Sequence, residues 1–182
     1  MSKHWSSALA AALAIALVIG WGVTHASKAG AFVAPQSSDA KALETKACGT
    51  SDNDVKYDVK TDKDHHPTPD PEHGKALVYI YRSGVLAGAV QTKAAIDAKW
   101  IGANLGNNYF FVQLAPGEHY ICSKAENNSI LTINVEAGKT YYVRQEISIG
   151  TTKARNFAVL MDDEKGKKEM DKCHLSISTE KK

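Results

Sequence analysis

The chain has 182 residues, of which 43% are hydrophobic and 23% charged, and its formal net charge is +2. This length fits one domain of ordinary size. The balanced charge excludes a strongly basic nucleic-acid-binding protein, and the apolar content excludes a chain that is disordered throughout.

Residues 1–26 have the composition of a secretory signal peptide. A basic start precedes an uncharged apolar run from 8 to 23, and small residues follow it. This order predicts a leader over residues 1–26 that is cleaved after Ala26 or Ala31. The run of about 16 residues is shorter than the roughly 20 of a spanning helix, which disfavours the alternative of an uncleaved anchor. We expect a secreted or periplasmic protein that contacts a membrane only through the leader, if the leader is retained.

Residues 27–73 predict a polar linker that is mostly irregular. Ser, Asp, Lys and Thr dominate, and three of the five prolines lie between residues 62 and 73. Because proline removes a backbone donor and fixes φ, we expect that stretch to be extended. Val55, Tyr57 and Val59 alternate with polar residues, which predicts one short strand.

From Gly74 the pattern changes to short strands separated by turns. Aromatic and β-branched residues fill the strands, whereas Gly, Pro and Asn mark the turns. The predicted strands span residues 76–82, 93–97, 100–105, 109–114, 119–124, 129–135, 140–147 and 156–161, and a short helix spans 162–170. This spacing predicts an all-β domain over residues 74–176, either an antiparallel β-sandwich of about 7–8 strands or a small barrel. A short C-terminal helix and a polar tail at 177–182 complete it.

Several of these segments, in this order, resemble a known bacterial family. They are Gly74–Arg82, Trp100–Gly102, Tyr109–Phe110, Leu114–His119 and Ala137–Tyr142. Together they are similar to the family called domain of unknown function 2846, and the Pro-Gly-Glu-His turn is also similar to PEGA surface domains. The resemblance implies an exported bacterial β-sandwich. It implies no activity and no catalytic residue.

Three cysteines, Cys48, Cys122 and Cys173, follow the predicted leader. Export would place them where disulfides persist, and an odd count leaves one thiol free or paired between chains. A Cys48–Cys122 or a Cys122–Cys173 bond would each stabilise the fold by about 4 kcal/mol through loop entropy, so energetics does not choose between them. The predicted strand at Tyr57 would bring Cys48 to the sheet, which favours Cys48–Cys122. Three reduced thiols remain the alternative.

The proline-containing stretch also carries candidate metal ligands. They are Asp64, His65, His66, Asp70 and His73. Histidine and carboxylate together can bind zinc, copper or nickel. Their spacing matches no closed tetrahedral site, and such tracts are usually solvated linkers. The sequence therefore favours a linker over a metal site, and we expect no cofactor.

Three further residues are candidates for ligand contact. Glu118 and His119 follow a tight turn, where such a pair could do acid–base chemistry, although strand-edge turn residues are the favoured interpretation. Trp100, beside the turn at residues 97–99, is the candidate for an exposed ring, because strand alternation assigns most other aromatic rings to the core. Without a Gly-x-Ser-x-Gly elbow or a phosphate-binding glycine loop in the sequence, we expect no enzyme.

The sequence thus predicts an exported, non-enzymatic β-sandwich module of the bacterial envelope that acts by binding or as a structural accessory. Its expected partner is an envelope protein or a glycan, and no nucleic acid. The alternatives are a secreted hydrolase with an unrecognised site and a metal-binding envelope protein that uses the histidine-containing linker.

Overall fold

The computed structural model describes residues 37–51, 54–149 and 154–181. The predicted leader, with its cleavage positions at Ala26 and Ala31, therefore lies outside the described residues. Within the described part of the chain, no helix is long and apolar enough to span a membrane.

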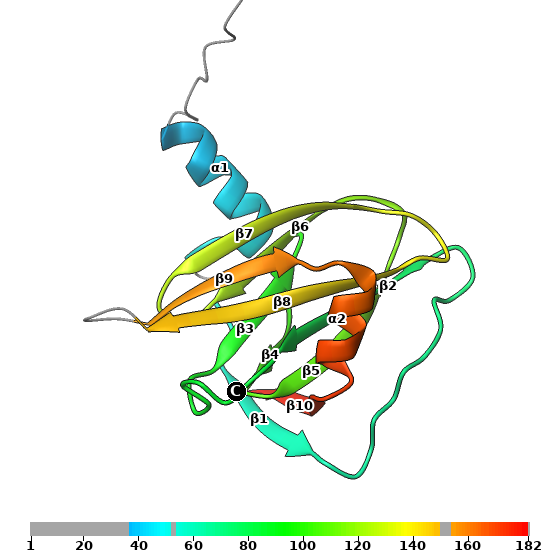
Figure 1. Cartoon of the computed structure of the whole chain (residues 1–182). Helices are drawn as coiled ribbons and strands as arrows, with labels where there is room; N and C mark the ends of the chain where they lie inside the picture. The colour runs from blue at the N-terminus through cyan, green and yellow to red at the C-terminus, as the bar shows by residue number, and fades with distance from the viewer. Residues whose placement is uncertain (1–36, 52–53, 150–153, 182) are drawn as a thin grey trace, which may run out of the picture. The chain divides into compact units, whose positions relative to one another are not determined.

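Ten strands in the described residues form two sheets that pack face to face (Figure 1). The six-stranded sheet has the order β1 (Tyr57–Asp62), β10 (His174–Glu180), β5 (Asn108–Leu114), β2 (Ala76–Arg82), β8 (Thr140–Ile149) and β9 (Ala154–Leu160). The four-stranded sheet has the order β4 (Lys99–Asn104), β3 (Thr92–Ile96), β6 (Gly117–Lys124) and β7 (Asn128–Val135). Helix α1 (Ser37–Cys48) precedes β1, and α2 (Asp163–Met170) lies between β9 and β10. The predicted all-β sandwich with a short C-terminal helix is confirmed.

Two strand pairs are parallel, which differs from the antiparallel sheet order that the sequence predicts. β8 runs parallel to β2, and β10 runs parallel to β5. A parallel pair needs a long crossover connection. Between β2 and β8 the chain contributes β5 and the whole four-stranded sheet, so no short-range signal in the sequence marks this pairing.

The main core lies between the two sheets. β2 is buried along its whole length, as the apolar residues on both of its faces predict. Its alternate residues Ala76, Val78 and Ile80 point into the sandwich, where they meet residues of the other strands. These are Ala94, Ile96, Phe110, Ile121, Ile133, Val135 and Val143. Because side chains alternate along a strand, Leu77, Tyr79 and Tyr81 lie on the outer face of the six-stranded sheet.

Two stretches of the predicted linker over residues 27–73 are regular elements. α1 begins with Asp39 in its first turn and has Lys46 in its last, which suits the helix dipole. It ends at Gly49, whose φ of +76° and hydrogen bond from its N–H to the Thr45 carbonyl form a left-handed cap. The predicted strand around Tyr57 is present as β1, which pairs with β10.

The last part of the predicted linker, residues 63–73, runs without helix or strand along the six-stranded sheet, and we call it the strap. The Tyr109 hydroxyl donates to the Pro67 carbonyl at 3.0 Å, and the Gln113 side chain donates to the Asp70 carbonyl at 3.1 Å. These bonds tie the strap to β5. The segment is therefore extended, as its prolines predict. It is packed on the domain and forms part of it, which differs from the predicted linker.

The predicted polar tail at 177–182 is also corrected by the structure. Residues up to Glu180 belong to β10, which lies between β1 and β5. The Ser176 hydroxyl donates to the Ala103 carbonyl at 2.6 Å, and the Ser178 hydroxyl accepts from the Ala103 N–H at 3.3 Å. β10 thus joins the edge of the four-stranded sheet through side chains that look like tail residues in the sequence.

Helix α2 covers the outer face of the six-stranded sheet. Asp162 caps it by accepting hydrogen bonds from the backbone N–H groups of Glu164 and Lys165, so the predicted helix start is confirmed. Gly166 lies against β8, where a Cβ atom would stand 2.5 Å from the Cβ of Tyr142. The helix covers a cluster that is rich in tyrosine: Leu77, Tyr79, Tyr81, Tyr109, Tyr142, Met170 and Cys173.

Candidate functional site

A disulfide between Cys48 and Cys122 joins the last turn of α1 to β6. The pairing that the sequence favours is therefore the one present, with 5.1 Å between the two Cα atoms. Cys173 is a buried free thiol. Burial, with a smaller effect of Glu169, raises the pKa of Cys173 to about 12. This thiol is unreactive at neutral pH, because the thiolate is the nucleophile.

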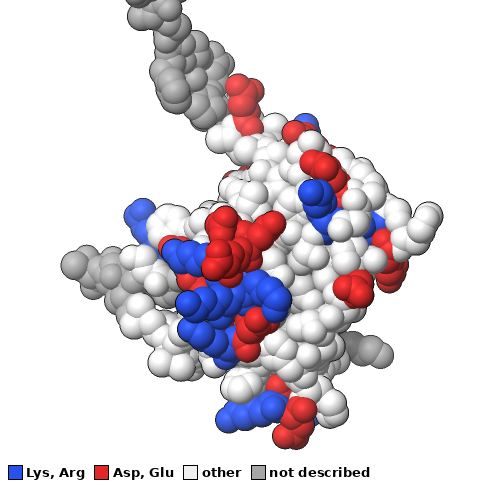
Figure 2. Space-filling model, turned by 45° about the vertical axis from the view of Figure 1, so that its right-hand side comes forward, with Lys and Arg blue, Asp and Glu red and all other residues white. Residues whose placement is uncertain are grey.

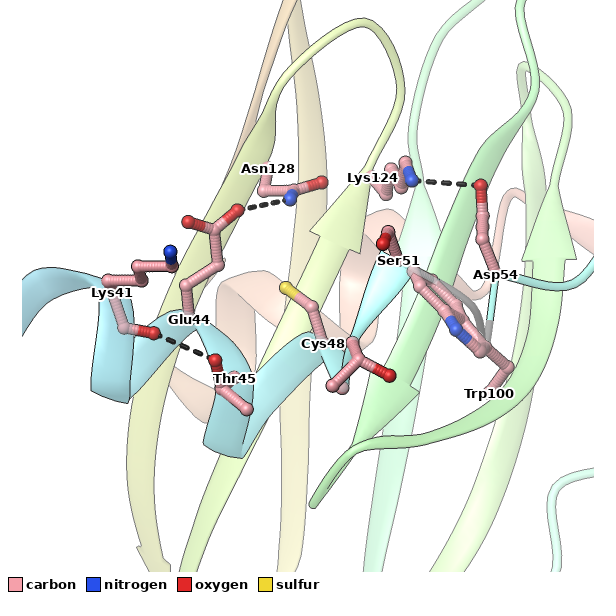
Figure 3. Close-up of a pocket in the computed structure, with 11 residues that line it drawn as sticks. Lys41, Glu44, Thr45, Cys48, Ser51, Asp54, Trp100, Lys124 and Asn128 are labelled. Atoms are coloured by element: carbon pink, nitrogen blue, oxygen red, sulfur yellow. Dashed lines mark hydrogen bonds and ion pairs between the residues drawn. The ribbon is translucent and has the colours of Figure 1, made fainter.

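A groove with a volume of about 410 Å³ lies between α1 and the four-stranded sheet, and we call it the α1 groove (Figure 3). It is lined by Lys41, Glu44, Thr45, Cys48, Gly49, Thr50, Ser51, Asp54, Trp100, Lys124 and Asn128. The disulfide therefore forms part of its wall. In Figure 3 the helix side chains and Asn128 lie on one side of Cys48, and Trp100 and Asp54 lie on the other.

The stripe of α1 that faces this groove is polar. Lys41, Glu44, Thr45 and Cys48 follow the i, i+3, i+4, i+7 spacing at which a packed helix usually carries apolar residues. The one large apolar residue of the helix, Leu43, is exposed instead. The apolar contact of α1 is limited to Ala47 and Cys48 at its end. The helix therefore does not close over the groove, which stays open and polar.

Trp100 forms the opposite wall and is buried, with 7% of its surface exposed. The expectation of an exposed ring is wrong, because the end of α1 and Tyr57 pack against this side of the sheet. The ammonium groups of Lys93 and Lys124 lie 5.1 Å and 5.9 Å from the ring centroid. The Trp100 ring thus lines the groove, but its faces are covered by other side chains and are not exposed to solvent.

Asp54 bridges these two lysines and completes the wall. One carboxylate oxygen accepts from Lys124 at 2.8 Å, and the other accepts from Lys93. Burial alone would raise the pKa of Asp54, but the hydrogen bonds and charges of the two lysines outweigh it and lower the pKa. Across the groove, Asn128 donates to Glu44. The charged groups of the groove are therefore largely paired.

His119 and Glu118 lie elsewhere, and they do not form an acid–base pair. His119 Nδ1 lies 2.6 Å from an Asp97 carboxylate oxygen, and Nε2 lies 2.8 Å from the Ala115 carbonyl. Glu118 instead accepts from the Tyr120 hydroxyl. Asp97 and the next residue both have positive φ in the hairpin turn between β3 and β4. His119 therefore braces this strained turn.

This brace predicts a pH-dependent stability. Burial lowers the pKa of His119, but the hydrogen bonds to Asp97 and Ala115 outweigh it and raise the pKa above 6.5. The stabilisation is complete below the unfolded-state pKa and is lost as pH rises through the raised pKa. We expect His119→Asn to lower the free energy of unfolding more at about pH 6 than at about pH 9, in urea titrations.

The control for this prediction is the same substitution in an Asp97→Asn background. There the pH dependence should largely disappear, because the charged acceptor is gone. A His119→Asn effect of the same size at both pH values would contradict the interpretation of His119 as an ionised brace.

The candidate metal ligands Asp64, His65, His66, Asp70 and His73 do not form a common site. His65 pairs with Asp62 at 2.9 Å, and the His66 ring packs on Tyr109 with 4.8 Å between ring centroids. Among the residues that the structure describes, no group of three or more His, Cys, Asp or Glu side chains could hold a metal ion.

The sequence contains a weak signal for the α1 groove. The polar i, i+3, i+4, i+7 stripe of α1 is visible in the sequence, but it is also what a fully solvated helix carries. Lys124 and Asn128 belong to two strands and Trp100 to a third, so only the fold brings them to the helix.

Comparison with known proteins identifies a family without a described activity. No solved structure matches the chain. A protein of Haemophilus influenzae (strain ATCC 51907 / DSM 11121 / KW20 / Rd), described as "Uncharacterized protein", is 33% identical over 109 residues. These cover 59% of this chain and 65% of the relative's length. Residues 72–157 match the family described as "Protein of unknown function (DUF2846)", which takes in β2 to β8 and part of β9. The sandwich of this chain is therefore similar to the DUF2846 family, and the resemblance that the order of its strand and turn motifs predicts is confirmed.

Proposed function

We propose that this chain is an exported, non-enzymatic module of the bacterial cell envelope that binds an envelope partner at the α1 groove. The observation that carries the proposal is the Cys48–Cys122 disulfide, which forms part of the groove wall. Disulfides persist in oxidising compartments such as the periplasm. The leader-like composition of residues 1–26 supports the same location.

The electrostatics of the groove support binding in preference to catalysis. Asp54 has a lowered pKa and already accepts from two lysines, which makes it a poor proton carrier at neutral pH. Glu44 accepts from Asn128. Lys41, Thr50 and Ser51 line the groove and make no side-chain hydrogen bond with a described residue, so their donors are available to a polar partner.

Export and oxidation are tested together. The full chain is produced in a Gram-negative host, the cells are fractionated, and free thiols are alkylated under denaturing, non-reducing conditions. We expect the protein in the periplasmic fraction with Cys173 alkylated and Cys48 and Cys122 protected. Recovery in the cytoplasm, or alkylation of all three cysteines, would refute the proposal.

Binding at the groove is tested with a charge reversal. Lys124→Glu breaks the bridge to Asp54 and adds a third carboxylate to the groove, beside those of Asp54 and Glu44. Lys99→Glu is the matched control, because Lys99 is an exposed residue of β4 that does not line the groove. We expect cross-linking in envelope extracts to give adducts with the wild-type chain and the control, and to lose them with Lys124→Glu. Identical adducts from all three would argue against the groove.

A further inference from the structure

A second cavity lies on the other side of the sandwich, between the strap, α2 and the outer face of the six-stranded sheet. Its volume is about 260 Å³, and it is lined by Thr68, Pro69, Asp70, Tyr79, Thr140, Tyr142, Lys167 and Met170. A cavity of about 330 Å³ shares Thr140, Tyr142 and Lys167 with it and continues toward Lys139, Asp163 and Glu164. We call the two together the tyrosine cleft. None of its residues lines the α1 groove.

Two stacked tyrosines form the floor of this cleft. The parallel register of β2 and β8 pairs Tyr79 with Tyr142. Their ring planes are nearly parallel, at 6°, with 5.4 Å between centroids. Both residues are more than nine-tenths buried, with 2% and 7% of their surfaces exposed. The floor is therefore rigid and belongs to the packed cluster beneath α2.

The hydroxyl groups of this pair have no hydrogen-bond partner among the described residues, unlike those of their neighbours. Tyr81 donates to Glu169 at 3.0 Å, and Tyr109 donates to the Pro67 carbonyl at 3.0 Å. Neither the Tyr79 nor the Tyr142 hydroxyl makes such a bond, and neither is among the partnerless atoms that are sealed from solvent. Both hydroxyls therefore open into the cleft.

A phenylalanine pair would pack this floor equally well, as Phe111 does beside Tyr79. Packing alone therefore does not account for the two hydroxyl groups. Burial raises the pKa of Tyr79 to about 12 and also raises that of Tyr142. Both phenols thus stay neutral at physiological pH, and each can donate and accept one hydrogen bond or more.

The rest of the lining includes hydroxyl groups that can both donate and accept hydrogen bonds, and it carries charged side chains of both signs. The hydroxyls of Thr68 and Thr140 also lack a hydrogen bond to a described residue. Lys167 pairs with Asp171 at 2.8 Å. Figure 2 shows basic side chains gathered in one cluster on this face, with acidic side chains directly beside it. A neutral ligand that carries several hydroxyl groups matches this lining.

We propose that the tyrosine cleft is a saccharide-binding site. The hydroxyls of a neutral sugar residue in the cleft would exchange hydrogen bonds with Tyr79, Tyr142 and Thr140. Hydroxyl groups that both donate and accept suit a ligand whose edges carry several hydroxyl groups. This site is separate from the α1 groove, so either proposal can be refuted without affecting the other.

The test uses the whole oxidised chain and three neutral probes: maltotriose, cellotriose and triacetylchitotriose. Each is titrated to millimolar concentration while amide chemical shifts are recorded. We expect at least one probe to bind and to shift resonances of the strap, β8 and α2. Tyr79→Phe and Tyr142→Phe should each weaken that binding about fivefold, the effect of one lost hydrogen bond, without loss of thermal stability.

Two control variants establish whether the probe binds in the cleft. Tyr120→Phe removes a hydroxyl that bonds Glu118 outside the cleft, and Lys124→Glu alters only the α1 groove. Both should bind the probe as the wild type does. The proposal is overturned if no probe binds, in which case the cleft holds only water, or if both phenylalanine variants bind with unchanged affinity. It is also overturned if glucuronate trimers bind more tightly than the neutral probes.

Discussion

Replacement of Cys48 and Cys122 by alanine is expected to lower the free energy of unfolding by about 4 kcal/mol. The bond joins residues separated by 74 positions, and a loop of that length gives this value when the crosslink restricts the unfolded chain. Both cysteines are buried, but replacement by alanine removes only one sulfur atom from each, so the void that it leaves is small. Urea titration of the oxidised wild type and the double variant measures the difference.

The same bond is expected to hold α1 in place. The buried contacts of this helix are limited to Ala47 and Cys48, and a helix of 12 residues is marginal in water without packing. In the double variant, amide exchange should accelerate in α1 before it does in the sheets. Reduced wild-type protein should behave in the same way. An unfolding midpoint that is equal in oxidised and reduced wild type would contradict both statements.

Gly166→Ala is expected to destabilise the domain by about 2–3 kcal/mol. In an exposed helix this change is favourable, but here the new Cβ would stand 2.5 Å from the Cβ of Tyr142, at a position fixed by the β8 backbone. α2 must move away from the sheet to relieve the contact. We expect a lower urea midpoint and a changed near-ultraviolet circular dichroism signal from the tyrosine cluster.

Lys168→Ala is the control within the same helix. Lys168 is exposed, so its replacement should change the free energy of unfolding by less than about 0.5 kcal/mol. If Gly166→Ala proves as mild as this control, α2 is not packed against β8 as closely as the structure indicates.

The central strands were predictable from the sequence because their signals are local. β2 carries apolar residues on both faces, and all of it is buried. The start of α2 was equally accessible, since Asp162 is a standard capping residue. The Cys48–Cys122 pairing followed from the placement of a strand at Tyr57.

The peripheral elements were not predictable, because their partners lie far away in the chain. β1 pairs with β10 from the opposite end of the chain, and in β10 Leu175 and Ile177 alternate with serines. The buried residue is Ser176, whereas Ile177 is exposed, so the sequence of this strand resembles that of a polar tail. α1 has an acidic start and a glycine stop, but it lies in a stretch whose composition favours a linker.

The candidate sites depend on the same long-range pairings. Trp100 is buried because α1 and Tyr57 cover it, so its local sequence alone suggested exposure. Tyr79 and Tyr142 become neighbours only through the parallel register of β2 and β8. Alternation assigned both rings to packed positions, which is correct, but it could not show that their hydroxyl groups meet an open cleft.

The place of β10 also sets the order in which the domain can be completed during its synthesis. Among the strands that the structure describes, β1 pairs with β10 alone, and β10 connects it to β5. β10 leaves the ribosome after the other nine described strands. Before β10 is made, β1 cannot pair with the six-stranded sheet. The contacts between β1 and β10 connect residues far apart in the sequence, so they form late. The six-stranded sheet of a nascent chain therefore stays incomplete until β10 has been made.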